Sequence, residues 1–179
     1  AIGIYRQLAG MDEEKAASWQ NQVAATYRDA GKCDEAVAVY QQLIKDAPEQ
    51  ANQWLWNTAD CYQQFGKYKE AIGVYRQCDN FPAAYQRMAD CHLHLKEWGP
   101  AYSLYLQIRD SHEPLSSWAQ LQMAYTLERG GDKEKAILAF QRVCEKFPQS
   151  SHASSAHAHL QTKYKINVTL GGAKQDADK

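Results

Sequence analysis

Histidine and cysteine are the residues of this chain that could do chemistry, because they are frequent ligands of protein-bound metals. His92 and His94 are two residues apart, and so are His157 and His159. On a helix that spacing turns the two rings toward opposite faces, whereas a helical metal pair needs a spacing of about three or four. His152 and His159 share a face but lie about two turns apart. We therefore expect surface histidines and no metal site.

The five cysteines do not form a recognisable framework: they are Cys33, Cys61, Cys78, Cys91 and Cys144. Their odd number and the absence of a C-x-x-C spacing argue against a disulfide frame and against a zinc site. Cys61 and Cys91 occupy the same place in two similar segments, TADCY at 58–62 and MADCH at 88–92. We expect this place to be in the interior, where cysteine behaves as a small hydrophobe. The sequence also lacks a glycine-rich phosphate loop, a G-x-S-x-G motif and a Cys–His nucleophile arrangement. We expect no enzyme activity and no cofactor.

The overall composition is that of a globular chain, with 45% hydrophobic and 23% charged residues among 179. Twenty Lys and Arg nearly balance 21 Asp and Glu. This balance argues against nucleic acid as a partner, because phosphate binding needs an excess of basic residues. No apolar run approaches the length of about 18 residues that predicts a membrane-spanning helix.

One short pattern recurs along the chain. Residues 1–7 read AIGIYRQ and residues 71–77 read AIGVYRQ, and related blocks begin at Ala36, Ala101 and Ala136. In each block an alanine precedes an aromatic residue by four positions, which places both on one helical face. The aromatic residues are Tyr5, Tyr40, Tyr75, Tyr105 and Phe140. Successive alanines are 35, 35, 30 and 35 residues apart.

A second recurring block precedes the first by one helix length. Ala24, Ala59, Ala89 and Ala124 occupy equivalent places in it. Turn residues separate the two blocks, as in AGKCDE at 30–35, and a proline follows each pair (Pro48, Pro82, Pro114 and Pro148). The repeating unit is therefore a helix, a short turn, a second helix and a break, in which alanine allows the two helices to approach closely.

This pattern resembles the tetratricopeptide repeat (TPR) family over about residues 1 to 150. The resemblance implies an all-α, right-handed superhelical solenoid of antiparallel helix pairs. Residues 1–9 are similar to the second helix of a repeat whose first helix would lie upstream. Repeat units are expected at 17–51, 52–81, 82–116 and 117–150, followed by a capping helix at 151–166 and a disordered tail at 167–179.

The unit at 52–81 is the shortest, and the turn of the unit after it has Lys96 where the others have glycine. We predict a short helix beginning near Lys67. Ala71 and Ala101 are 30 residues apart, whereas the other recurring alanines are separated by 35. Two arrangements are compatible with this shorter spacing: the following unit is tilted relative to its neighbours, or a tighter loop leaves the stacking normal.

In TPR proteins the first helices line a concave face that binds a peptide or a partner helix. From the residues that the alignment places on that face, ten form the predicted binding site: Asn21, Arg28, Gln53, Trp56, Asp60, Asp90, His94, Trp118, Tyr125 and Arg129. Trp56 and Trp118 would act as anchors, since one aromatic side chain supplies a large contact area. Asp60 and Asp90 would form an acidic stripe that favours a partner with Lys or Arg. The alternative is that both tryptophans pack against neighbouring helices.

We therefore expect a non-catalytic module that binds a protein or peptide. One alternative is a self-associating scaffold, because Ile2, Ile4, Tyr5 and Leu8 form an apolar strip that could pair two copies. The other is a regulatory region of a larger enzyme. Free thiols favour the cytoplasm, whereas residues 130–160 are similar to repeats of TPR proteins associated with the bacterial envelope.

Overall fold

The computed structural model describes residues 1–171, and this part of the chain is helical without strands. The ten α-helices are α1 (Ile2–Met11), α2 (Ala16–Asp29), α3 (Cys33–Asp46), α4 (Ala51–Gln64), α5 (Tyr68–Tyr75), α6 (Ala83–His94), α7 (Trp98–Ser111), α8 (Ser116–Arg129), α9 (Lys133–Lys146) and α10 (Ser151–His159). Short 3₁₀ turns at Glu13–Lys15, Pro48–Gln50 and Glu113–Leu115 precede α2, α4 and α8. The expected all-α fold is confirmed. Within the described residues, no helix combines the length and apolar character needed to cross a membrane.

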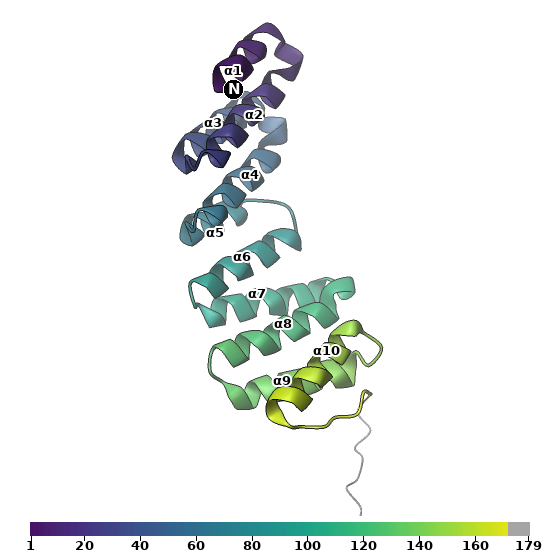
Figure 1. The fold of residues 1–179 in the computed structure, drawn as a ribbon. Coiled ribbons are helices and arrows are strands. Elements are labelled where there is room, and N and C mark those ends of the chain that lie inside the picture. Colours follow the sequence, from purple (N-terminus) through teal and green to yellow (C-terminus); the bar gives the residue numbers. More distant parts are fainter. Residues whose placement is uncertain (172–179) are drawn as a thin grey trace, which may run out of the picture. The chain divides into compact units, whose positions relative to one another are not determined.

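The chain forms two compact units, whose boundary falls within α6. In the first unit, Ala1–Cys91, each helix from α1 to α4 packs against the next one along the chain (Figure 1). In the second unit, which begins at His92, α7 packs against α8 and α8 against α9, and α10 packs against both α8 and α9. Each unit is thus built from antiparallel neighbours joined by short connections.

The recurring alanines lie at the contacts between helices. All eight are fully buried: Ala24, Ala59, Ala89 and Ala124 on the first helices, and Ala36, Ala71, Ala101 and Ala136 on the second. The aromatic residues four positions after the second set (Tyr40, Tyr75, Tyr105 and Phe140) are at most 1% exposed. A methyl group allows the helix backbones to approach, and the rings fill the space that remains.

Each helix pair is closed by the same turn. Gly31, Gly66 and Gly131 adopt left-handed backbone angles, with φ of +77°, +73° and +89°. Lys96 takes the equivalent position with φ of +59°. One backbone hydrogen bond recurs after these residues: Lys32 N–H to Tyr27 O, Lys67 N–H to Tyr62 O and Glu97 N–H to His92 O at 2.9 Å, and Asp132 N–H to Leu127 O at 3.0 Å. The turn geometry therefore persists where glycine is replaced.

The short helix predicted near Lys67 is confirmed. Helix α5 has 8 residues, whereas α3, α7 and α9 have 14 each. The chain leaves α5 through turns at Gln77 and Cys78, whose N–H groups donate to Val74 and Tyr75 carbonyls. Whether the following repeat is tilted stays a prediction.

The C-terminal region differs from the expected disordered tail. Helix α10 continues as a π-helical turn at Leu160–Tyr164, and Ile166 and Val168 then pack against the cluster around Phe140. The N–H of Gly171 donates to the Cys144 carbonyl at 3.1 Å. Residues 167–171 are therefore held on α9 because two apolar side chains find a buried surface there. The rest of the expected tail, residues 172–179, lies outside the described residues.

The strained turn at Lys96 generates a stability prediction. A side chain in the left-handed region costs about 1–2 kcal/mol, which exceeds the entropic cost of glycine of about 0.5–1 kcal/mol. We expect Lys96→Gly to raise the free energy of unfolding by up to about 1 kcal/mol, measured by urea denaturation. Lys32→Gly is the matched control, because Lys32 has an ordinary φ of −100° at the next position of an equivalent turn. An equal gain in both variants would contradict this interpretation.

Candidate functional site

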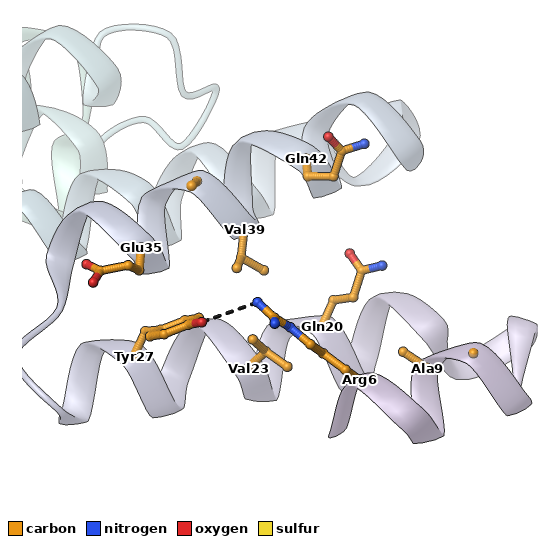
Figure 2. Close-up of a pocket in the computed structure, with 10 residues that line it drawn as sticks. Arg6, Ala9, Gln20, Val23, Tyr27, Glu35, Val39 and Gln42 are labelled. Atoms are coloured by element: carbon orange, nitrogen blue, oxygen red, sulfur yellow. Dashed lines mark hydrogen bonds between the residues drawn. The ribbon is translucent and has the colours of Figure 1, made fainter. Parts of the chain in front are cut away.

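A pocket of about 620 Å³ lies in the first unit between α1, α2 and α3. Side chains from all three helices surround it (Figure 2). Ten residues line it: Arg6, Ala9 and Gly10 from α1, Gln20, Val23 and Tyr27 from α2, and Glu35, Ala38, Val39 and Gln42 from α3. None of the ten residues predicted from the sequence is among them.

Small residues at the end of α1 explain why there is open space here. In the alignment of the second helices, Ala9 corresponds to Ile44 in α3, Arg109 in α7 and Cys144 in α9. Gly10 corresponds to Lys45 and Asp110. A long side chain at either place would reach into the space between neighbouring helices, so the pocket arises from missing side-chain volume. This comparison of equivalent positions is the sequence signal that could have revealed the pocket.

Apolar and charged groups are separated within the pocket. Val23 and Val39 face each other across it, and the guanidinium of Arg6 points toward Tyr27 (Figure 2). An Arg6 Nη atom donates to the Tyr27 hydroxyl at 3.2 Å. In the part of the chain that the structure describes, neither Arg6 nor Glu35 forms an ion pair with another side chain. The pocket therefore offers an apolar surface between a cation and an anion that a ligand could engage.

The lining includes no cysteine, histidine or serine. Its groups can bind a ligand by burial, hydrogen bonds and ion pairs. Over residues 1–171, no group of three or more His, Cys, Asp or Glu side chains is arranged to hold a metal ion. The arrangement supports recognition.

Six of the predicted site residues lie in the first unit, where several are already engaged by the protein. The Trp56 ring is half-buried and packs edge-on against Tyr75, with ring centroids 5.2 Å apart. The Asp60 carboxylate accepts a hydrogen bond from the Tyr75 hydroxyl and lies 3.9 Å from Arg87 Nε. The other four are Asn21, Arg28, Gln53 and Asp90; Asn21 contacts Asn57 at 3.5 Å and Arg28 lies 3.8 Å from Asp29.

The contact between Tyr75 and Asp60 reduces the negative charge that the sequence leads us to expect on this face. Burial and the neighbouring Asp60 carboxylate raise the pKa of Tyr75, so its hydroxyl stays a donor over the physiological range. Gln63 also accepts from this hydroxyl at 2.8 Å. Since Asp60 is paired with a phenol and lies near Arg87, its charge is partly offset, and the predicted acidic stripe is weaker than the sequence implies.

The remaining four predicted residues, His94, Trp118, Tyr125 and Arg129, lie in the second unit. Trp118 is half-buried and packs edge-on against Tyr105 at 5.5 Å. Tyr125 packs against Phe140 at 5.0 Å and against His159 of α10 at 5.2 Å. His94 and Arg129 are exposed. Both tryptophans thus pack against neighbouring helices while retaining an exposed part, and their role as binding anchors stays a prediction.

Helix α10 and the turn after it also cover the end of α8. Glu128 accepts hydrogen bonds from His159 Nε2 at 2.9 Å and from the Tyr164 hydroxyl, and it pairs with Lys163 Nζ at 3.1 Å. Burial alone would raise the pKa of Glu128, but these three partners outweigh burial and lower the pKa. Burial and the Glu128 carboxylate raise the pKa of Tyr164 to about 12. Glu128, His159, Lys163 and Tyr164, which we call the Glu128 clasp, hold α10 and the turn after it against α8.

The packing and the repeats can now be compared with known proteins. Two family profiles of the tetratricopeptide repeat match this chain, one over residues 24–85 and the other over residues 118–150, which together are more than half of the chain. The chain belongs to the tetratricopeptide repeat family. A search of curated protein sequences found no match.

Solved TPR structures share the fold. MamA from Desulfovibrio magneticus RS-1 is 15% identical, with a TM-score of 0.57 over 83% of this chain and 88% of that chain. YrrB, a TPR protein described as having an unusual peptide-binding site, is 17% identical, with a TM-score of 0.55 over 92% and 88%. Identities at this level show the fold alone. Family and fold together support a protein-interaction module.

The Glu128 clasp generates a pH prediction. Because the folded-state pKa of Glu128 is lowered, its stabilisation is present above its unfolded pKa of about 4.3 and is lost as the pH falls through the folded value. We expect Glu128→Gln to reduce the free energy of unfolding by about 1–2 kcal/mol at pH 7. Denaturation midpoints at decreasing pH should show this difference shrinking below about pH 4. The exposed Glu145→Gln is the control, and a Glu128→Gln effect independent of pH would contradict the assignment.

Proposed function

We propose that this TPR chain is a non-catalytic protein-interaction module that binds a segment of a partner protein in the pocket between α1, α2 and α3. The observation that carries the proposal is the pocket itself, whose volume of about 620 Å³ lies in the range of about 300–1,000 Å³ typical of ligand sites. Three helices form it, so its shape is fixed by packed elements and not by a loop.

The lining specifies the chemistry of the bound segment. Val23 and Val39 favour an apolar anchor side chain, which would be buried between α2 and α3. Arg6 favours a carboxylate beside that anchor, because its guanidinium contacts a neutral phenol. Glu35 favours a basic group on the other side. The two opposite charges would fix the direction in which the segment lies.

The known relatives are consistent with this role. YrrB, which shares this fold, is described as having an unusual peptide-binding site, and this likeness supports the proposal. In the present chain we assign recognition to the pocket between α1, α2 and α3. The basic partner suggested by the sequence has less support, since Asp60 is hydrogen-bonded by Tyr75 and lies near Arg87.

Filling the pocket tests the proposal. Short random peptides displayed on phage would be selected against the immobilised chain, and the enriched peptides would be titrated against variants by fluorescence anisotropy. We expect an apolar residue next to an acidic one among the enriched sequences. Ala9→Ile places an isoleucine where α3 carries Ile44, so it should weaken binding at least about tenfold, or 1.4 kcal/mol. Arg6→Glu should weaken it through charge reversal.

Ala158→Ile is the matched control, because it adds the same atoms at an exposed position of α10. Thermal unfolding followed by circular dichroism would show that each variant folds. Equal binding by Ala9→Ile and the parent chain would contradict the pocket assignment.

The face of the first helices is a second candidate surface, since Trp56 and Trp118 keep exposed parts while packing edge-on against buried tyrosines. Trp56→Ala and Trp118→Ala belong in the same titrations. A loss of about 1–3 kcal/mol in these variants, with Ala9→Ile unchanged, would move the site to that face and reject the pocket.

Self-association is a further alternative, and the surface of α1 favours it. No residue of α1 is fully buried, and Ile4 and Met11 are 63% and 77% exposed. Sedimentation velocity over a range of protein concentrations separates this alternative from peptide binding. A monomer at all concentrations agrees with the pocket proposal, whereas a dimer abolished by Ile4→Glu would support the scaffold.

A further inference from the structure

Two buried cysteines from different helices touch each other in the first unit. Cys33 is the first residue of α3 and Cys61 lies in α4. Their Sγ atoms are 3.5 Å apart, and the Cys61 thiol donates to the Cys33 sulfur. Cys33 is 6% exposed and Cys61 is fully buried. The repeat pattern explains only why small residues stand here; it does not require two sulfur atoms in contact.

The other cysteines are engaged differently. The thiol of Cys78 donates to the Val74 carbonyl at 3.6 Å, and that of Cys144 donates to the Ala153 carbonyl at 3.6 Å. Cys91 is fully buried. Over residues 1–171, Cys33 and Cys61 are the one pair of thiols in mutual contact, so the remaining three serve as internal controls.

We propose that Cys33 and Cys61 are a modification site at which a two-electron oxidant, such as a peroxide, forms an intramolecular disulfide between α3 and α4. A disulfide needs the sulfur atoms about 2.05 Å apart, so they must approach by roughly 1.5 Å. Cys33 is placed for such a shift because a residue at the start of a helix has no intrahelical partner for its N–H group. This inference goes beyond the proposed function and does not depend on it.

The reaction proceeds through the more accessible sulfur. The thiolate of Cys33 attacks one oxygen of hydrogen peroxide, the O–O bond breaks, and the products are a Cys33 sulfenic acid and hydroxide, which becomes water by taking the proton that the Cys33 thiol released. The Cys61 thiolate then attacks the Cys33 sulfur, so that the S–S bond forms and the S–O bond breaks. The departing hydroxide takes the proton that Cys61 released. Overall, two thiols are oxidised and one peroxide is reduced to two waters.

The surroundings of Cys61 make the second step dependent on pH. Burial and the adjoining Cys33 raise the pKa of Cys61 to about 12, while Arg28 and Lys67 act in the opposite direction without offsetting this rise. Since the thiolate is the attacking species, the disulfide should form slowly at neutral pH and faster as the pH rises. Once formed, it ties the start of α3 to α4 and should raise the urea midpoint of the chain.

Peptide mapping tests the proposal on the full chain. The reduced protein would be treated with hydrogen peroxide at a series of pH values, denatured, alkylated and digested with trypsin. We expect the peptides Cys33–Lys45 and Asp46–Lys67 to be joined, with a mass lower than their sum by two hydrogen atoms. This species should form before any other cysteine pair, and its rate should increase with pH. Non-reducing electrophoresis would show that the chain stays monomeric.

Variants identify the atoms involved. Cys33→Ser and Cys61→Ser should each abolish the linked species, whereas Cys91→Ser should leave it unchanged. The mapping on the parent chain keeps the proposal testable even where a serine variant folds poorly. Recovery of Cys33 and Cys61 as separate alkylated peptides after oxidation would overturn the proposal, and so would joining to Cys91 or Cys144 to the same extent.

Discussion

Close approach of neighbouring helices at buried alanines is the constraint on which the rest of this structure depends. Eight alanines at repeating positions have no exposed surface, and an aromatic ring four residues after each alanine of the second helices fills the remaining space. An alanine contributes little hydrophobic free energy by itself, but its small size allows the backbones to come close enough for dispersion contacts along the helices. The walls of the pocket, the contact between Cys33 and Cys61 and the clasp at Glu128 all arise where these packed helices bring distant residues together.

The fold could be predicted from the sequence because the close packing at alanines depends on a local pattern that repeats along the chain. Alanine and an aromatic residue four positions later recur in five blocks, so one correct interpretation applies to the whole chain. The short helix α5 followed from counting residues between blocks, and the turn at Lys96 keeps its geometry because the flanking helices determine it. Residues 167–171 were mispredicted because Ile166 and Val168 form no periodic pattern, and the surface that they cover exists only after α9 and α10 have packed.

The candidate site was harder to predict from the sequence, since it depends on contacts between helices. Helical phase placed Trp56, Asp60 and Tyr125 on one face, but it could not show that Tyr75 donates to Asp60 or that His159 packs on Tyr125. The pocket is defined by small side chains at Ala9 and Gly10, and a search for large or charged residues overlooks positions of that kind. Comparing equivalent positions of the second helices would have identified it.

The most direct test of the account is the free energy of unfolding of Ala59→Leu, measured by urea denaturation beside Ala158→Leu. Ala59 is fully buried between helices, whereas Ala158 is exposed on α10. The account predicts that Ala59→Leu loses about 1–3 kcal/mol because the larger side chain forces the helices apart. Ala158→Leu should stay within about 0.5 kcal/mol of the parent. Parental stability in Ala59→Leu would contradict the claim that alanine sets the spacing of the helices.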